Sequence, residues 1–412
     1  MAVQYRWRVW EGWLLMLLFL FPFHVIHSQD AADAFILGKW YFEQGRYGDA
    51  VTTLNAAGER FSGTRDFHII RGQCYTKTGQ YQKALDDLMI ADRIEEGCAD
   101  LYIARNYALM GKDSLAVLLL ERHLRSKYRQ PEMVIRMDPD FRLLERSRLW
   151  IQLWKNEFYT PAENASREAG YLFSAGRVEE AFTVIDAALS QGLRSTALLA
   201  IKAKIYLSYS NEKQAEAVLS EALSLEPSNT ELLKQRAALY RQMRQPRNAV
   251  SDLTFALSRD PSQIGLLKMR AEAYSDMNMP DMAARDIEQY LLYDRDNPEA
   301  VSLAGRIYYR KKDFIRALDY CHRAVDLDPG NAVVFNNRAE VYLASKLYQP
   351  AINDFSMSLD LLPDQKDVYL SRAGARLAVG DREGACYDWN KAVRLGSAEA
   401  IEYIEKNCRT EK

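Results

Sequence analysis

Small residues recur along this chain at a fixed interval, and they divide it into units of similar length. Ala50 and Ala84 are 34 residues apart, and Ala116 marks the next unit after a slightly shorter step. The interval of 34 then holds without a slip over seven further alanines: Ala181, Ala215, Ala249, Ala283, Ala317, Ala351 and Ala385. A fixed period of this length is typical of stacked helical repeats rather than of a closed domain around a catalytic cleft.

Other apolar positions keep fixed offsets from these alanines. Gly or Ala stands twelve residues before each of them, Tyr usually stands nine before, and a bulky apolar residue such as Leu88 or Phe355 stands four after. Such spacings place these side chains on one face of a helix. Small residues let two antiparallel helices approach closely, and Pro227 and Pro261 fall where a unit ends because proline interrupts helical hydrogen bonding. The pattern therefore predicts one helix-turn-helix hairpin per unit.

This pattern resembles the tetratricopeptide repeat (TPR) over nearly the whole chain after residue 30. The resemblance implies an all-α fold, an α-solenoid of stacked TPR hairpins that form a right-handed superhelix. In this family the first helix of each hairpin lines the concave side, so we expect an open curved trough along the molecule.

The repeats fall into two arrays. Residues 31–124 predict an N-terminal array of three repeats, and residues 162–396 predict a C-terminal array of seven. Between them, residues 125–161 break the period and predict an irregular helical insert, in which Asp138-Pro139-Asp140 has the pattern of a helix start. Residues 397–412 predict a capping helix and tail, because a terminal repeat needs a cover for its apolar face.

Residues 1–28 differ from the repeats and have the pattern of a signal peptide. Arg6 and Arg8 precede an apolar run from Trp13 to Phe23, and Ser28 is a small residue at the expected cleavage position. An uncleaved anchor is the alternative, although the run is shorter than the ~20 apolar residues that span a bilayer.

Either form of the N-terminus leaves the repeats outside the cytoplasm, because positive charge precedes the apolar run and Asp30 follows it. Gln29 directly after a serine also resembles exported proteins of Bacteroidota, which implies a periplasmic TPR protein. We therefore expect an exported protein in the periplasm, with a secreted or membrane-anchored form as alternatives. Membrane contact is expected only through an uncleaved N-terminal segment.

Composition excludes several classes of partner and chemistry. The net charge is −2, from 54 basic and 56 acidic residues, so no strong field attracts nucleic acid. His68, His123 and His322 belong to different units and lack metal-ligand spacing, so we expect no metal site. No nucleophile elbow, P-loop or dinucleotide fingerprint is present. We expect no catalytic residues, no cofactor and no small-molecule substrate.

Two cysteines lie close to the C-terminus. If the last repeat and the capping helix form an antiparallel hairpin, Cys386 and Cys408 lie almost opposite each other, and an exported compartment permits a disulfide between them. Related Bacteroidota repeat proteins also imply such an ending. Two packed free thiols are the alternative, because the geometry decides.

The family resemblance places candidate partner-binding residues on the first helices of the C-terminal array. Arg and Tyr contribute strongly to interfaces, and Asn hydrogen-bonds extended peptides. The candidates are Lys204, Lys234, Arg241, Lys268, Arg306, Tyr309, Arg310, Asn336, Asn337 and Glu340. A solvated face of mixed charge is the alternative for each of them.

Three functions are compatible with this pattern. The first is a non-enzymatic protein–protein interaction scaffold that binds a protein or peptide in the concave groove, within an envelope assembly or secretion complex. The second is a structural spacer without a specific ligand. The third is an envelope enzyme that uses residues 125–165, which contain no His or Cys; Ser147, and Ser166 just beyond the segment, are candidate hydroxyl nucleophiles there. The pattern sets no oligomeric state.

Overall fold

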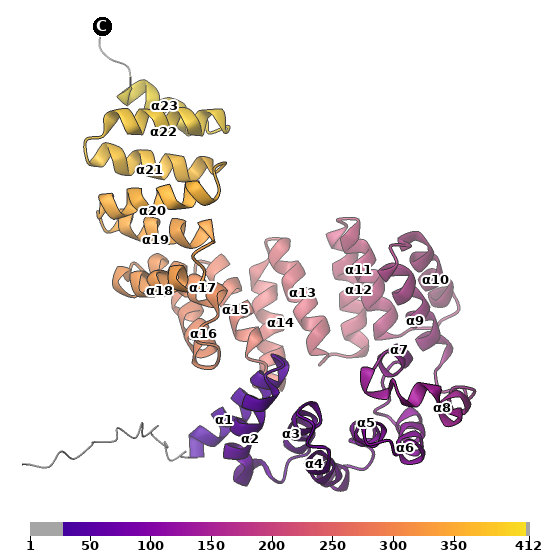
Figure 1. The fold of residues 1–412 in the computed structure, drawn as a ribbon. Coiled ribbons are helices and arrows are strands. Elements are labelled where there is room, and N and C mark those ends of the chain that lie inside the picture. Colours follow the sequence, from indigo (N-terminus) through magenta and orange to yellow (C-terminus); the bar gives the residue numbers. More distant parts are fainter. Residues whose placement is uncertain (1–27, 409–412) are drawn as a thin grey trace, which may run out of the picture.

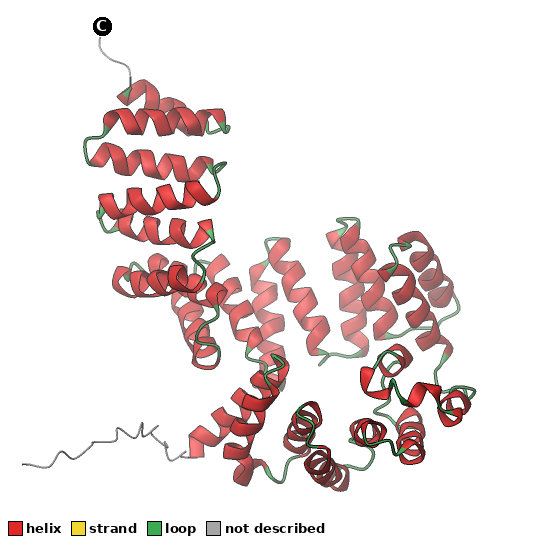
Figure 2. Ribbon diagram, viewed as in Figure 1, coloured by secondary structure: helices red, strands yellow, loops and turns green. Residues whose placement is uncertain are grey.

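A computed structural model describes residues 28–408 of the chain. These residues form helices and connecting turns, with no strand among them (Figure 2). The predicted signal peptide or anchor lies, except for Ser28, outside the described residues. Within residues 28–408, no helix has both the length and the apolar character needed to cross a membrane.

Three hairpins open the described chain, and the connection to the next hairpins is irregular. The hairpin helices are α1 (Ser28–Glu43), α2 (Tyr47–Phe61), α3 (Arg65–Lys77), α4 (Tyr81–Ile94), α5 (Asp100–Leu109) and α6 (Asp113–Arg125). The irregular part holds α7 (Glu132–Arg136), the 3-10 helices η1 (Pro139–Phe141) and η2 (Leu144–Arg146), and α8 (Arg148–Leu153).

Seven further hairpins and a last short helix complete the molecule (Figure 1). Their helices are α9 (Pro161–Ser174), α10 (Val178–Ser190), α11 (Thr196–Ser208), α12 (Glu212–Leu225), α13 (Thr230–Gln242), α14 (Pro246–Arg259), α15 (Gly265–Asp276), α16 (Pro280–Tyr293), α17 (Pro298–Arg310), α18 (Phe314–Leu327), α19 (Ala332–Ala344), α20 (Tyr348–Leu361), α21 (Lys366–Ala378), α22 (Arg382–Arg394) and α23 (Glu399–Asn407).

The small-residue columns sit where the two helices of a hairpin meet. Every alanine of the 34-residue column is fully buried. On the facing helix, a Cβ placed on Gly38 would lie only 2.6 Å from Leu54 Cγ, and one on Gly72 only 2.8 Å from Leu88 Cγ. Because no larger side chain fits there without a shift of its neighbour, these columns set how closely the helices of each hairpin pack.

The turn inside each hairpin has one residue in the left-handed region. Glycine takes this position in five of these turns, as at Gly45 (φ +72°) and Gly380 (φ +86°). Five hairpins of the second array use other residues there: Ser210, Arg244, Asn278, Lys312 and Lys346, with φ between 55° and 62°. Such a conformation is unfavourable for residues with a Cβ, so these turns carry local strain.

The insert has its own aromatic core, which packs on the third hairpin. Phe141, Trp150 and Phe158 are buried together with Leu120 and Leu124 of α6. The Asp138 side chain accepts a hydrogen bond from the Asp140 N–H, as the Asp-Pro-Asp pattern predicts, but the helix that follows is only a three-residue 3-10 turn. The insert is thus a packed connector with little regular helix.

The N-terminal hairpin contacts the middle of the C-terminal array, which closes residues 28–293 into a ring. Lys39 Nζ lies 2.8 Å from Asp260 Oδ2, on the loop after α14. The Trp40 ring packs edge-to-face on Tyr290 of α16, with 5.8 Å between ring centroids. Figure 1 shows α1 beside α14, and α17–α23 leaving the ring as an arm. The trough that we expected to be open along its whole length is therefore closed on itself over helices α1–α16.

Candidate partner-binding surface

The first helices of successive hairpins approach one another directly and form the inner face of the solenoid. Direct backbone contacts join α9 to α11, α13 to α15, α15 to α17, α17 to α19, and α19 to α21. Because the stack is curved, these helices lie close together on its inner side. Their solvent-facing side chains form one continuous surface there. The ten predicted binding residues all lie on this series of helices, from α11 to α19.

Much of the predicted surface is occupied by contacts between neighbouring hairpins. Arg241 of α13 forms ion pairs with Glu272 and Asp276 of α15, the latter at 2.8 Å. Lys268 of α15 pairs with Glu299 at the start of α17. These basic side chains already have acidic partners in neighbouring hairpins. They therefore stabilise the stacking of the repeats and are not free to bind a ligand.

Two polar residues of the predicted surface are occupied in the same way. Arg310 donates hydrogen bonds to the backbone carbonyl and side chain of Ser275, the latter at 3.0 Å. Asn337 Nδ2 donates to Ser302 Oγ at 3.1 Å. Both contacts run from one hairpin to the one before it.

Three predicted residues on α17 and α19 form no ion pair or hydrogen bond to a neighbouring hairpin within the described residues. Arg306 is exposed and forms no ion pair within residues 28–408. Asn336 Oδ1 is shielded from solvent and accepts no hydrogen bond from the described residues. Tyr309 is half-buried, and its pKa is raised by burial and by the charge of Glu340.

Glu340 lies half-buried at the same place. Burial raises the pKa of its carboxyl above the usual range, although Ser371 Oγ donates a hydrogen bond to it at 2.8 Å. We call Arg306, Tyr309, Asn336 and Glu340 the α17–α19 patch. The other two predicted residues lie apart from it: Lys234 pairs with Glu231 in its own helix at 3.2 Å, and Lys204 is exposed on α11.

A second set of polar residues, which the sequence analysis missed, lies inside the hairpins. In five hairpins, an arginine of the first helix binds both carboxylate oxygens of a buried aspartate sixteen residues later, at 2.7–2.9 Å. The pairs are Arg71–Asp87, Arg236–Asp252, Arg270–Asp286, Arg338–Asp354 and Arg372–Asp388.

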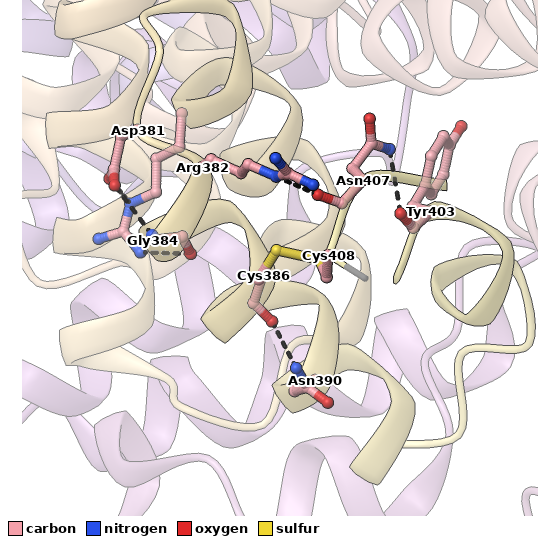
Figure 3. The surroundings of a disulfide bond; sticks show 9 residues. Asp381, Arg382, Gly384, Cys386, Asn390, Tyr403, Asn407 and Cys408 are labelled. Carbon is pink, nitrogen blue, oxygen red and sulfur yellow. Dashed lines mark hydrogen bonds and ion pairs between the residues drawn. A yellow bond between two sulfur atoms is a disulfide. The ribbon is translucent and has the colours of Figure 1, made fainter. Parts of the chain in front are cut away.

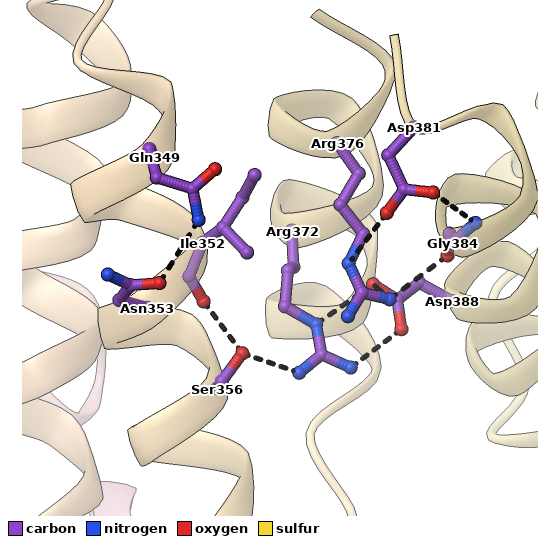
Figure 4. A network of polar contacts seen from close by, with 9 residues as sticks. All are labelled: Gln349, Ile352, Asn353, Ser356, Arg372, Arg376, Asp381, Gly384 and Asp388. Carbon is purple, nitrogen blue, oxygen red and sulfur yellow. Dashed lines mark hydrogen bonds and ion pairs between the residues drawn. The ribbon is translucent and has the colours of Figure 1, made fainter. Parts of the chain in front are cut away.

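Some of these arginines also reach the preceding hairpin. Arg372 Nη1 donates to Ser356 Oγ at 2.9 Å, and Arg376 adds a further bond to Asp388 (Figure 4). The signal was present in the sequence, since each Arg directly precedes the Gly/Ala column and each Asp follows the next alanine mark by three. These pairs are structural, because their acidic partners are buried away from any ligand.

Cys386 of α22 and Cys408, directly after α23, form a disulfide with 5.8 Å between their Cα atoms (Figure 3). It fastens the end of α23 to α22. Next to it, Arg382 donates a hydrogen bond to the backbone carbonyl of Asn407. The other three cysteines are free and buried, and burial raises the pKa of Cys74 and Cys321 to about 12.

The described histidines have structural partners. His68 is buried between Asp87 and the carbonyl of Ser62, and His123 accepts a hydrogen bond from the Gln130 N–H. Residues 28–408 contain no group of three His, Cys, Asp or Glu side chains placed to hold a metal ion.

Comparisons with known proteins agree with this architecture. The family model "Tetratricopeptide repeat" matches residues 268–332, and the model "Anaphase-promoting complex, cyclosome, subunit 3" matches residues 18–89. A tetratricopeptide repeat protein of Parabacteroides merdae has a similar fold, with a TM-score of 0.50 and 18% identity, over 60% of this chain and 99% of that one.

Two curated relatives match shorter stretches. Serine/threonine-protein phosphatase 5 of Mus musculus is 31% identical over 99 residues, which are 24% of this chain and 19% of that protein. RNA polymerase II-associated protein 3 of Xenopus tropicalis is 33% identical over 91 residues, 22% of this chain and 14% of that protein. The chain thus spans less than a fifth of the length of these relatives.

The stacked hairpins and their inner surface define a helical-repeat solenoid. With the matches above, the chain is similar to tetratricopeptide-repeat proteins, and the expected all-α solenoid of stacked hairpins is confirmed. Proteins of this family generally mediate protein–protein interactions, typically by binding protein or peptide partners, and their fold is generally a non-enzymatic scaffold.

Proposed function

We propose that this chain is a non-enzymatic scaffold that binds a protein or peptide on the α17–α19 patch. Arg306 offers an exposed guanidinium that forms no ion pair within residues 28–408, and Tyr309 offers a partly buried aromatic ring with a hydroxyl. Arg and Tyr are over-represented among residues that dominate interface energies. The Asn336 amide can hydrogen-bond an extended backbone, and Glu340 adds a carboxyl of raised pKa.

The single observation that carries this proposal is the contrast along the inner face. Arg241, Lys268, Arg310 and Asn337 are bound to neighbouring hairpins, whereas Arg306 forms no such bond within the described chain. A side chain that already has a partner must lose it before it binds a ligand, so its net contribution to affinity is small. The patch is therefore where an incoming segment gains most.

We further propose that the scaffold acts outside the cytoplasm, in the periplasm, as part of an envelope assembly or secretion complex. Arg6, Arg8 and the apolar run that follows support export. The Cys386–Cys408 disulfide also favours an oxidising compartment, because cytosolic thiols are kept reduced. Mass spectrometry of the mature N-terminus and of cell fractions tests this part. Recovery of the full-length chain from the cytoplasm with both thiols reduced would reject it.

The binding surface is tested by site-specific crosslinking in cells that make the protein. A photo-crosslinking residue in place of Val333, an exposed residue of α19 one turn before Asn336, should trap a partner, while one at Arg285, an exposed arginine of α16, should not. Arg306→Glu should abolish capture and leave thermal unfolding unchanged, since exposed substitutions shift stability by about 0.5 kcal/mol or less. Equal capture at both positions, or full capture by Arg306→Glu, would show that the patch is not the binding surface.

A further inference from the structure

A cleft of about 810 Å³ lies where the insert meets the C-terminal array, far along the chain from the α17–α19 patch. One wall is the start of α7 with the residues before it, and the other is formed by the inner faces of α9 and α11. Its volume is within the range of about 300–1,000 Å³ that is usual for ligand sites. It is a different surface from the predicted groove residues, none of which lines it.

Several apolar side chains line this cleft, and two of them are largely exposed. Met133 of α7 is 43% exposed and Tyr171 of α9 is 61% exposed, and both line it. Ile201 of α11 also lines the cleft, and its Cδ1 would lie 3.5 Å from a Cβ placed on Gly170 of α9. Isolated exposed apolar residues are ordinary, but several that face one cleft indicate an interaction site.

The charges around the cleft neutralise one another. Arg129 binds both carboxylate oxygens of Glu163, at 2.8 and 2.9 Å, and Arg167 pairs with Glu132. The two remaining charged groups of the lining are also occupied, because Thr196 donates to Glu226 and Arg194 lies 3.4 Å from a glutamate of α12. With three basic and three acidic groups in the lining, the rim has no net charge and favours neither anions nor cations.

We infer that this cleft binds an uncharged apolar stretch of a partner polypeptide, a few residues long. The apolar walls take the side chains, and burying a charge between them would cost more than it gains. Asn164 lines the same cleft, and its exposed side-chain amide makes no hydrogen bond within the described chain. A side-chain amide has both a donor and an acceptor, so it can pair with the C=O and N–H of a peptide bond. This favours a polypeptide over an acyl chain. The inference rests on the proposal that the chain binds polypeptides, but it concerns a second surface.

The test uses fluorescein-labelled peptides of twelve residues with identical flanks and different centres: Leu-Phe-Leu, Ser-Gly-Ser, Leu-Lys-Leu or Leu-Glu-Leu. Fluorescence anisotropy with the full mature chain should show binding of the Leu-Phe-Leu peptide and affinity at least about tenfold weaker for the other three. Met133→Glu should weaken binding of the Leu-Phe-Leu peptide by about tenfold or more, and Met133→Leu should restore it.

Met137→Glu is the matched control, because Met137 ends the same segment, is 73% exposed and does not line the cleft. It should leave affinity within about twofold, and Arg306→Glu should do the same. Equal loss in the two methionine variants, equal affinity for the charged peptides, or no binding by any peptide would overturn the inference. So would tighter binding of a fluorescent fatty acid that Met133→Glu abolishes. Loss of crosslinking at position 333 alone would instead count against the α17–α19 patch.

Discussion

At the scale of single residues, the arginine–aspartate pairs explain how polar groups hold an otherwise apolar stack together. Each pair joins the two helices of one hairpin, and in three of the five the arginine also donates to a serine or threonine of the preceding hairpin. The aspartates are buried, and each buried carboxylate is stabilised by the arginine that binds it. Hairpins without the arginine also lack the aspartate, and apolar residues such as Val184 and Val218 commonly take its place.

Removal of one such arginine should therefore destabilise the array strongly. Arg270→Ala leaves the 3%-exposed Asp286 carboxylate without its partner and should cost about 3 kcal/mol, measured by urea denaturation. Arg285→Ala, at an exposed position of the next helix, should cost about 0.5 kcal/mol or less. If the two variants unfold at the same urea concentration, the pairs are not significant for stability.

The left-handed turn residues lead to a prediction of opposite sign. Arg244 has φ of +57°, so Arg244→Gly should stabilise the protein by about 1 kcal/mol, because glycine adopts this conformation without a steric penalty. Arg247→Gly makes the same chemical change three residues later, inside α14, and should destabilise by up to about 1 kcal/mol. Differential scanning calorimetry of the two variants decides this, and a lower melting temperature for Arg244→Gly would contradict it.

At the scale of elements, the hairpins could be predicted from the sequence and the insert only in part. The spacing of alanine, glycine and tyrosine is local information, and each hairpin depends only on its neighbours, so period and phase define the fold there. The insert has no repeat, and its structure depends on the packing of residues such as Phe141 in one buried cluster with Leu120, which spacing does not encode. The same limit applies to the predicted binding surface: family position indicates which helices line the inner face, but not which of their side chains already bind neighbouring hairpins.

His123 makes the junction between α6 and the insert sensitive to pH. Burial, with a smaller contribution from the charge of Arg105, lowers its pKa to about 4, while the unfolded value is about 6.5. The unfolded chain therefore takes up this proton first as pH falls, and stability is lost between about pH 6.5 and pH 4, by an amount on the order of 2 kcal/mol. His123→Gln, which keeps an acceptor for the Gln130 N–H, should reduce this loss in melting curves recorded across that range.

The exposed His322 gives the control for this effect. His322→Gln should leave the pH dependence of the melting temperature as it is in the unmodified protein. An unchanged slope between pH 6.5 and 4 in His123→Gln would show that another group is responsible.

At the scale of the whole molecule, the contact between α1 and the C-terminal array decides the shape, and sequence could not predict it. Lys39 and Asp260 are 221 residues apart, and whether they meet depends on the rotation that accumulates over all hairpins and the insert between them. The contact consists of a few side chains rather than closely packed backbones. Besides Lys39 and Trp40, it includes the Tyr293 hydroxyl, which donates to Asp33 at 3.1 Å. Contacts that involve so few side chains between parts of one chain generally allow relative motion.

Charge reversal at this contact should open the ring, and reversal of both partners should close it again. Although burial alone would raise it, hydrogen bonds from Lys39 and Ser262 lower the pKa of Asp260 to about 2, so the pair stays charged from neutral pH down to about pH 4. Lys39→Glu or Asp260→Lys places like charges together and should increase the radius of gyration measured by small-angle X-ray scattering. The double variant restores an opposite-charge pair and should return the radius to that of the unmodified protein. Arg46→Glu, an exposed change just beyond α1, should leave it unaltered. A double variant as expanded as the single ones would mean that this ion pair does not hold the ring closed.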